Sequence, residues 1–259
     1  MRTIKYYIPQ IIKDSLRPIW RQVRPFTHKI ILTSLMPEGC IFEVTNPVEK
    51  SRVVNLGYEE ELIRIFLSEI NSGDVVFDIG SCVGLYALHA ALCGARVVAF
   101  EPDPIYRKRL NKNIRINKLK KSIYVVKWAV SDRKGIGTLY TDGLSTNRSP
   151  SLNQVGERGA VTVKTDTIDN AIQKGKLPLP NIVKLDIEGA EILALHGMKQ
   201  LLRSKDAPQY IFIEFHPDFL RGFNSSVEEC LQLIPSAYDK ISSKPRDGQM
   251  HYIFKKNTS

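Results

Sequence analysis

Short apolar runs alternate with segments of helical spacing through most of the chain. The apolar runs have the length and composition of strands buried on both faces, and they lie at residues 75–79, 96–100, 123–130, 182–185 and 210–215. Segments whose apolar positions recur at helical spacing lie at residues 59–70, 85–92, 105–117, 191–202 and 227–234. This alternation predicts an α/β fold, a doubly wound and mainly parallel sheet with helices on both faces.

Two parts of the chain depart from this alternation. A β insertion at about 135–165 is predicted by two strand-like segments around a polar loop, at residues 138–140, 161–164 and 142–159. The loop is a candidate substrate loop, because its Ser, Asn, Gly and Pro content suits a mobile surface segment. A closing antiparallel hairpin is predicted from residues 238–241 and 251–254, with its turn near Asp247 and Gly248.

The first 56 residues do not continue the pattern. Apolar positions in residues 1–35 have roughly helical spacing, but Pro9, Pro18 and Pro25 break it into short pieces. Residues 36–56 are expected to be irregular or strand-like. The sequence therefore predicts an N-terminal extension at residues 1–56 and one domain at residues 57–259.

The positive charge of the chain is concentrated in this extension. The formal net charge is +10, and the first 30 residues hold seven basic residues against one acid, Asp14, which leaves +4 for the rest. The charge therefore says little about chemistry in the main domain. We predict that residues 1–30 contact an anionic membrane, since basic residues there are interleaved with Tyr6, Tyr7 and Trp20. The alternative is a solvated arm that packs on the domain.

The cysteines and the hydropathy pattern suggest a compartment. The four cysteines have no metal-ligand spacing, which favours buried thiols in a reducing environment. The longest uncharged stretch, residues 79–95, is shorter than the ~20 apolar residues of a spanning helix. No secretory signal pattern is visible. We therefore expect a cytoplasmic protein, with any membrane contact at the inner face.

The first motif with chemical content is a glycine-rich turn. Asp78 lies at the end of the first predicted core strand, and Gly80, Ser81 and Gly84 follow it before a helix. Glycines let the backbone turn sharply and approach a ligand at a helix N-terminus. The G-x-x-x-G spacing differs from the G-x-G-x-x-G of nicotinamide and flavin binders. On its own, the motif fits an ordinary tight βα loop equally well.

The second motif is an acid at the end of the next strand. Glu101 follows Gly80 by 21 residues and is placed to accept hydrogen bonds from both hydroxyls of a ribose. Asp103, followed by Pro104, fits the N-cap of the next helix better. The two motifs together predict a nucleoside ligand at the switch point of the sheet. The chain lacks the phosphate-binding G-x-x-x-x-G-K-[ST] pattern of nucleotide triphosphatases.

The third motif places charges in a strand that should be apolar. Lys184 and Asp186 alternate with apolar residues, and Glu188 and Glu191 follow directly. Buried charges are costly unless they are paired or used, so this cluster favours a functional site. A fixed ion pair from Lys184 to Asp186 or Glu188 is the structural alternative.

The fourth motif ends the fifth strand of the alternating pattern. His216 could take a proton from a substrate hydroxyl, and Glu214 could orient it or bind substrate. A loop-entry histidine beside a turn-forming Pro217 explains the segment equally well. The choice between these two interpretations is left open by the residues alone.

In their order and spacing, these motifs resemble those of the FkbM-type family of class I S-adenosylmethionine-dependent methyltransferases. The resemblance covers about residues 57–259 and rests on four segments: Phe77-Asp-Ile-Gly80, Ala99-Phe-Glu-Pro102, Ala129-Val-Ser-Asp132 and Lys184-Leu-Asp-Ile-Glu-Gly-Ala-Glu191. The last is the most specific. Cys82 and Val83 depart mildly from the usual residues, and residues 1–56 match nothing diagnostic.

The resemblance implies S-adenosylmethionine as cofactor and a hydroxyl of a sugar, glycan or secondary metabolite as acceptor. It assigns cofactor contacts, from the amino-acid part through the ribose to the adenine, to Asp78, Gly80, Ser81, Gly84, Asp186, Glu101, Ala129 and Val130. The candidates for accepting the proton of the hydroxyl are Asp186, Glu188 and His216. A divalent metal held by Asp186, Glu188 and Glu214 is compatible with these residues but not required by them.

Two alternatives belong to other classes. The net charge suggests a nucleic-acid-directed methyltransferase, but the excess charge lies in one terminal segment and no base-methylation motif is present. We therefore expect a small-molecule or glycan acceptor and no nucleic-acid partner. The other alternative is a protein that binds S-adenosylmethionine without catalysis.

Overall fold

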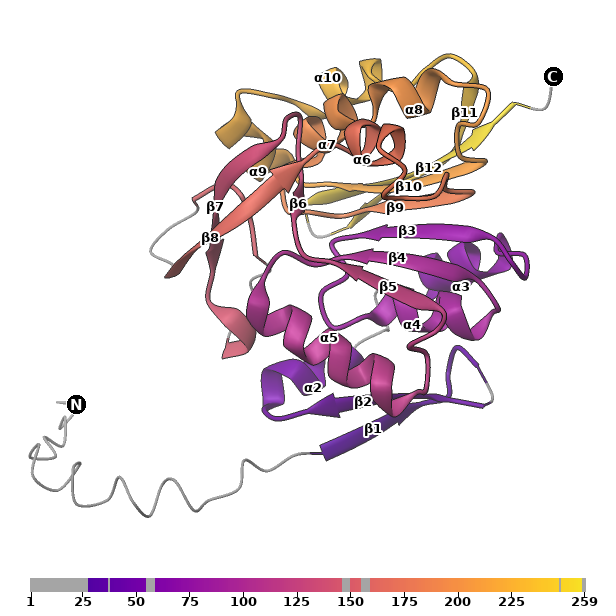
Figure 1. The fold of residues 1–259 in the computed structure, drawn as a ribbon, viewed down its shortest axis with the longest axis vertical. Coiled ribbons are helices and arrows are strands. Elements are labelled where there is room, and N and C mark those ends of the chain that lie inside the picture. The colour runs from indigo at the N-terminus through magenta and orange to yellow at the C-terminus, as the bar shows by residue number, and fades with distance from the viewer. Residues whose placement is uncertain are drawn as a thin grey trace, which may run out of the picture.

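A computed structural model of the chain describes residues 28–36, 38–54, 59–145, 150–154, 159–246 and 248–257. Its centre is a seven-stranded sheet in the order β11-β12-β10-β9-β3-β4-β5 (Figure 1). The strands are β3 (Val75–Ile79), β4 (Arg96–Phe100), β5 (Ile123–Val126), β9 (Ile182–Leu185), β10 (Tyr210–Phe215), β11 (Tyr238–Arg246) and β12 (Gln249–Lys256). All neighbours from β10 to β5 are parallel, and β12 is antiparallel to β10 and β11. The predicted fold class, with its closing hairpin, is confirmed.

Helices cover both faces of this sheet (Figure 1). They are α3 (Glu60–Ser68), α4 (Leu85–Leu92), α5 (Pro104–Ile116), α6 (Ile168–Gln173), α7 (Glu191–Gly197), α8 (Lys199–Arg203), α9 (Pro217–Leu220) and α10 (Val227–Gln232). Alternate residues of β3 enter two different cores: Phe77 packs with residues of α6, α7 and α8, and Val76 packs with residues of α3, α4 and α5. Because both faces are covered, the parallel strands are mostly apolar, and the buried charges of Asp78, Lys184 and Glu214 are exceptions.

Local signals set the start of the helix after β4. The Asp103 carboxylate accepts hydrogen bonds from the N–H groups of Ile105 and Tyr106, and Pro104 occupies the first helical position. The predicted capping role of Asp103 is therefore confirmed. This assignment leaves Glu101 free of the capping role, at the end of β4.

The β insertion is confirmed, but one predicted strand is divided by it. The strand expected at residues 123–130 ends at Val126, and β6 (Ala129–Val130) instead pairs with β8 (Gly159–Asp166) in a second sheet of order β6-β8-β7. β7 (Gly135–Thr141) is antiparallel to β8, and a short 3-10 helix, η2 (Gly143–Ser145), follows it. The rings of Trp128 and Phe100 pack edge to face with their centres 5.3 Å apart, at the point where the chain leaves the first sheet for the second.

Two further expectations need correction. The helix predicted at 191–202 is divided at Met198, whose ψ of 17° and φ of −121° are not helical, into α7 and α8. The segment expected to be irregular or strand-like contains a strand and a helix, β2 (Cys40–Val44) and α2 (Pro47–Val54). Apolar periodicity predicts neither α2 nor the break at Met198. The helix α2 has few apolar positions, and the break depends on tertiary packing.

The strands before α2 are attached to α5. β1 (His28–Leu32) pairs with β2, and the other edge of β2 is hydrogen-bonded by α5 side chains: Asn113 Oδ1 accepts from Glu43 N, and Asn117 accepts from Ile41 N and donates to its carbonyl. Arg109 adds an ion pair to Glu43 at 2.8 Å. Residues 28–54 therefore pack on the same unit as the sheet.

The basic segment at residues 1–27 and Asp247 of the predicted turn lie outside the described residues. The predicted membrane contact of residues 1–30 therefore stays a prediction. In the described part of the chain, no helix has the length and apolarity that a membrane span requires.

The turn after β3 lies directly against the end of β9. Gly80 has a φ of +89°, and a Cβ there would lie 1.9 Å from the carbonyl oxygen of Asp186. Gly73 has nearly the same φ, +93°, but open space around it. The two glycines therefore separate the cost of a left-handed backbone from the cost of close packing.

We expect Gly73→Ala to lower the free energy of unfolding by about 1 kcal/mol through backbone strain alone. Gly80→Ala should cost roughly 3 kcal/mol, because the turn must also move away from Asp186. Urea denaturation followed by circular dichroism measures both. Equal losses in the two variants would contradict the close approach of the turn to β9.

Candidate active site

The candidate site lies at the carboxyl ends of the central strands. β3 is flanked by β4 on one side and by β9 on the other, and the helices that follow β3 and β9 pack on opposite faces of the sheet. This is the switch point at which ligands of open α/β sheets bind. Two cavities open here, and both are lined by Gly80, Cys82, Asp186 and Glu188.

The first cavity is largely apolar and encloses about 620 Å³ of empty space. Phe100 and Pro102 line it from β4, Leu139 and Leu152 line it from the insertion, and Ala129 and Val130 of β6 lie between them. Ala129, Val130 and Glu101 are therefore together, as predicted. Apolar walls with Glu101 on one side and Asp186 and Glu188 at the boundary with the second cavity suit a ligand that has a flat apolar part and a hydroxylated part.

Glu101 is a buried acid that lines this cavity but not the second. It is 3% exposed; its Oε1 accepts from Asp103 N and its Oε2 from Cys82 N, each at 2.8 Å. Burial raises the pKa of Glu101 to about 8, although these two N–H groups favour the charged form. Each carboxylate oxygen can accept a second hydrogen bond, so the group is positioned for two ligand hydroxyls.

The glycine-rich turn is shaped by its own hydrogen bonds. Gly80 N and Ser81 N both donate to the Phe100 carbonyl, and Ser81 Oγ donates to the Asp78 carbonyl at 2.7 Å. Gly84 begins α4 with a φ of +98°, and a Cβ there would collide with the Leu88 and Leu110 side chains. Gly84 lines neither cavity. Its place in the structure is that of a packing residue beneath the turn.

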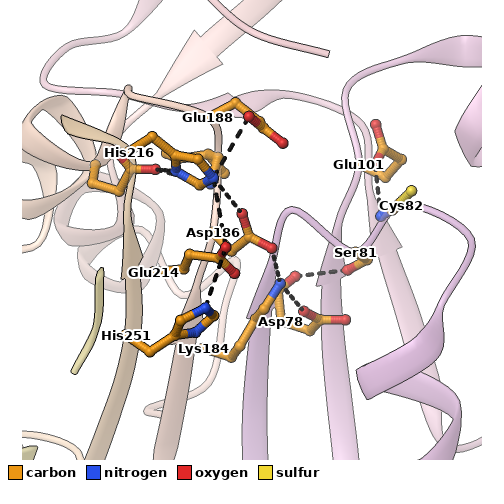
Figure 2. A network of polar contacts seen from close by, with 12 residues as sticks. Asp78, Ser81, Cys82, Glu101, Lys184, Asp186, Glu188, Glu214, His216 and His251 are labelled. Atoms are coloured by element: carbon orange, nitrogen blue, oxygen red, sulfur yellow. Dashed lines mark hydrogen bonds and ion pairs between the residues drawn. The ribbon is translucent and has the colours of Figure 1, made fainter. Parts of the chain in front are cut away.

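The second cavity is polar, and Lys184, which lines it, points toward Asp78 and Asp186 (Figure 2). Lys184 Nζ is 3.0 Å from Asp186 Oδ2 and 3.8 Å from Asp78 Oδ1, and it lies 4.9 Å from the centre of the Tyr86 ring. Burial opposes its charge, but Asp186 and Asp78 outweigh that and raise the pKa of Lys184. The ion pair considered from the sequence therefore exists.

The pKa values of Asp78 and Asp186 shift in opposite directions beside Lys184. Burial raises the pKa of Asp78 despite Lys184. Burial also acts on Asp186, but Lys184 and His216 lower the pKa of that carboxyl. Neither carboxylate oxygen of Asp78 accepts a hydrogen bond of normal geometry from the described residues. Asp78 therefore fits a ligand that brings its own hydrogen-bond donors, such as an ammonium group.

His216 lies among four carboxylates (Figure 2). Its Nδ1 is 3.0 Å from Glu191 Oε1, and its Nε2 faces oxygens of Glu188, Asp186 and Glu214 at 3.5, 3.7 and 3.8 Å. Burial opposes its charge, but Glu191, Glu188 and Asp186 raise the pKa of His216 to about 10. The three predicted proton-accepting residues are thus brought together, and a protonated ring would donate rather than accept.

Glu214 lies between two histidines. Its Oε1 is 3.8 Å from His216 Nε2 and 3.4 Å from His251 Nε2. Burial and the charge of Asp186 raise the pKa of Glu214 to about 8. His251 comes from β12 of the closing hairpin.

Sequence reasoning gave no role to two residues of the site. Glu191 is fully buried and accepts from Gly189 N and Ile187 N as well as facing His216. Arg52 of α2 lines the polar cavity, 5.3 Å from the Tyr106 ring centre and with Nη1 3.4 Å from Cys82 Sγ. The sequence does offer a signal for Glu191, because an acid stands there at the start of an otherwise apolar helix. No local sequence pattern distinguishes Arg52 from the other basic residues.

Comparison with known proteins agrees with this geometry. The Methyltransferase FkbM domain family matches residues 78–241. The hexuronic acid methyltransferase AglP of Haloferax volcanii is 31% identical over 177 residues, which is 68% of this chain and 70% of that protein. The ribosomal protein L11 methyltransferase of Bacillus cereus is 27% identical over 117 residues, 44% of this chain and 34% of that protein.

Two solved structures share the fold. An FkbM methyltransferase of Methylobacillus flagellatus has a TM-score of 0.50 and 19% identity, covering 74% of this chain and 46% of that one, so the chain spans about half its length. A putative rRNA methylase of Clostridium thermocellum has a TM-score of 0.50 and 11% identity, and the match covers 77% of this chain and 97% of that one. At these identities the likeness concerns the fold alone.

The sheet, its switch-point cavity and the family match define an S-adenosylmethionine-dependent methyltransferase of the Rossmann-like class. The chain belongs to the FkbM methyltransferase family.

Replacing Lys184 tests how far the site depends on its cation. We expect Lys184→Met to lower the free energy of unfolding by about 3–5 kcal/mol at neutral pH, because two buried carboxylates lose their partner. The loss should shrink as the pH falls and these carboxylates become protonated. Urea denaturation at several pH values measures it.

Lys244→Met is the matched control. Lys244 forms an ion pair with Glu61, and their side chains are 45% and 73% exposed. Its loss should change the stability by less than about 1 kcal/mol at any pH. A similar cost for both lysines would mean that Lys184 is not an essential counter-charge.

Proposed function

We propose that the protein transfers a methyl group from S-adenosylmethionine to a hydroxyl oxygen of a sugar, with hexuronic acids as the first acceptor class to test. Two observations support this. AglP, named for hexuronic acid, is 31% identical over two thirds of the chain. The two cavities meet at Asp186 and Glu188, so a cofactor in one and an acceptor in the other would be adjacent.

The apolar cavity is the proposed seat of the nucleoside part of the cofactor. Glu101 would accept hydrogen bonds from the two ribose hydroxyls, and Ala129 and Val130 would contact the adenine. Asp78, with buried carboxylate oxygens that lack hydrogen-bond donors among the described residues, would take the ammonium group beside Gly80 and Ser81.

The cofactor supplies a sulfonium methyl group, whose carbon–sulfur bond breaks as the carbon–oxygen bond forms. The chain provides alignment and a place for the proton of the hydroxyl. Asp186 and Glu188 lie at the boundary of the two cavities, so either carboxylate could accept this proton. Lys184 fixes Oδ2 of Asp186, which leaves Oδ1 turned toward His216.

The polar cavity argues against a nucleic-acid acceptor. Glu59, Asp78, Asp186, Glu188 and Glu214 all line it. A concentration of carboxylates repels a polyanionic backbone, which is bound instead by basic surfaces. A small acceptor carries at most one such charge and can present hydroxyl groups to this cavity, so it meets much less repulsion than a polyanion.

The activity is tested with methyl-labelled S-adenosylmethionine and the aryl glycosides of glucuronic acid, galacturonic acid and glucose. We expect label in a hexuronoside, as a methyl ether that survives mild alkali. A base-labile product would be an ester on the carboxylate and would contradict transfer to a hydroxyl. Transfer to RNA but to no sugar would contradict the acceptor class.

The pH dependence of nucleoside binding tests the role of Glu101. Its carboxylate must be ionised to accept from both ribose hydroxyls, and its pKa is raised to about 8. The affinity for 5′-methylthioadenosine, which lacks the titrating amino-acid part, should therefore rise with pH up to about 8 and then level off. Below that pH the change should approach tenfold per unit. Calorimetric titration measures it.

Two variants complete this test. Glu101→Gln should bind weakly and without this pH dependence, whereas Glu228→Gln, an exposed acid on α10, should behave as wild type. Circular dichroism confirms folding, since one amide oxygen replaces two acceptors at Glu101. A pH dependence that persists in Glu101→Gln would rule out Glu101 as its source.

A further inference from the structure

We propose that Asp186, Glu188 and His216 form a binding site for a divalent metal ion at the boundary of the two cavities. Within the described residues, these three offer ligand atoms that all lie within 4.8 Å of one another. They come from three positions: the end of β9, the loop after it, and the end of β10. The cluster faces the polar cavity, so an ion can reach it from solvent.

The distances are close to those of a coordination sphere. His216 Nε2 is 3.5 Å from Glu188 Oε2 and 3.7 Å from Asp186 Oδ1. With metal–ligand bonds of about 2.1 Å, neighbouring ligand atoms lie about 3.0 Å apart in an octahedral site and about 3.4 Å in a tetrahedral one. The two distances from Nε2 therefore exceed these spacings by a few tenths of an ångström, and the Asp186 and Glu188 oxygens, which lie within 4.8 Å of each other, would have to draw together around the ion. Glu214 Oε1, 3.8 Å from Nε2, is near enough to act as a fourth ligand.

His216 is presented to the centre of the cluster in the manner of a metal ligand. The residue is 4% exposed, and its Nδ1 lies 3.0 Å from the fully buried Glu191, which fixes the ring. Its Nε2 makes no hydrogen bond within the described residues and is surrounded by carboxylate oxygens beyond hydrogen-bond length. A carboxylate on the far nitrogen is the usual support of a metal-binding histidine.

The two acids are also held with one oxygen toward this centre. Lys184 occupies Oδ2 of Asp186, and Oδ1 is the oxygen that faces His216. Glu188 has a φ of +55°, a left-handed conformation that is costly for a residue with a side chain. That backbone, fixed by the hydrogen bonds of Gly189 N and Ile187 N to Glu191, turns the Glu188 carboxylate toward Nε2.

The charge of the cavity calls for a further cation. Five carboxylates line it, from Glu59, Asp78, Asp186, Glu188 and Glu214. Lys184, Arg52 and the protonated His216 are the cationic side chains among the lining residues. A metal ion would displace the proton of His216 Nε2, because only the unprotonated nitrogen has a lone pair to donate. A divalent ion would compensate much of this excess. Mixed oxygen and imidazole ligands suit Mn²⁺ and related ions.

A metal ion here would define the acceptor more narrowly, and this part rests on the proposed function. An anionic sugar is repelled by carboxylates, but a metal ion beside them attracts it. A hydroxyl next to a carboxylate or next to a second hydroxyl offers two oxygens to one ion. Coordination would hold the reacting oxygen and make its proton easier to remove. The acceptor class is therefore a chelating sugar, a hexuronic acid or a vicinal diol.

The metal site is tested by Mn²⁺ titration of the full-length protein after removal of metals with EDTA. Electron paramagnetic resonance counts free Mn²⁺ and requires neither cofactor nor acceptor. We expect one saturable Mn²⁺ per chain. Glu188→Gln, which removes a charged ligand while keeping its shape, should weaken binding at least tenfold. Glu191→Gln, which weakens the support of both His216 and the loop that carries Glu188, should weaken it 10- to 100-fold.

Asp218→Asn is the matched control. This acid is two residues from His216, and its side chain is 80% exposed and outside the cluster. It should bind Mn²⁺ as wild type does, and circular dichroism should show all variants folded. Absence of saturable binding to wild type would overturn the proposal, as would equal binding to wild type and Glu188→Gln.

S-adenosylmethionine titration of the same preparations separates the two proposals. Loss of Mn²⁺ binding with intact cofactor binding isolates the metal site. Mn²⁺ binding by a protein that methylates no sugar would retain the metal site and contradict the proposed acceptor instead.

Discussion

The site depends on one buried cation between two strands. Asp78 and Lys184 are directly paired across the parallel ladder of β3 and β9, and Asp186 follows two residues later on the same face. Without Lys184, two carboxylates would be left close together and largely buried, which proteins avoid by protonation or by unfolding. The ion pairs therefore hold together the two strand ends between which the cofactor cavity opens. The Gly80 turn can lie against Asp186 only because these ends stay in register.

The loop after β9 separates the two cavities of the site. The loop after β9 carries Glu188 in a left-handed conformation, and Glu191 holds that loop and His216 through one carboxylate. One wall thus faces an apolar cavity suited to a nucleoside and the other faces a polar cavity rich in acids. A reaction between two bound molecules needs such a shared boundary, because it fixes their relative positions before any bond changes.

The sheet and the location of the site could be predicted from the sequence, because buried parallel strands are apolar runs and their carboxyl ends meet at one edge. Asp78, Glu101 and Asp186 could be placed there by that rule alone. The pairing of β6 with the second sheet could not be predicted, because Ala129 and Val130 are as apolar as the preceding strand β5. The positions of His251 and Arg52 at the site could not be predicted either. They depend on pairing between segments far apart in the chain, which leaves no periodic trace.

Asn113 of α5 and Asn117, the residue directly after it, form hydrogen bonds with backbone groups along one edge of β2, and the strand is thereby fixed to the helix that follows the end of β4. The helix after β2 then brings Arg52 to the wall of the polar cavity. Ser51 and Arg52 lie outside residues 78–241, the part that matches the family, whereas most residues that line the polar cavity lie within it. One part of the wall of the polar cavity is thus encoded apart from the stretch that lines the apolar cavity. Substitutions in residues 28–54 can reshape the polar cavity while the residues that surround the nucleoside stay unchanged.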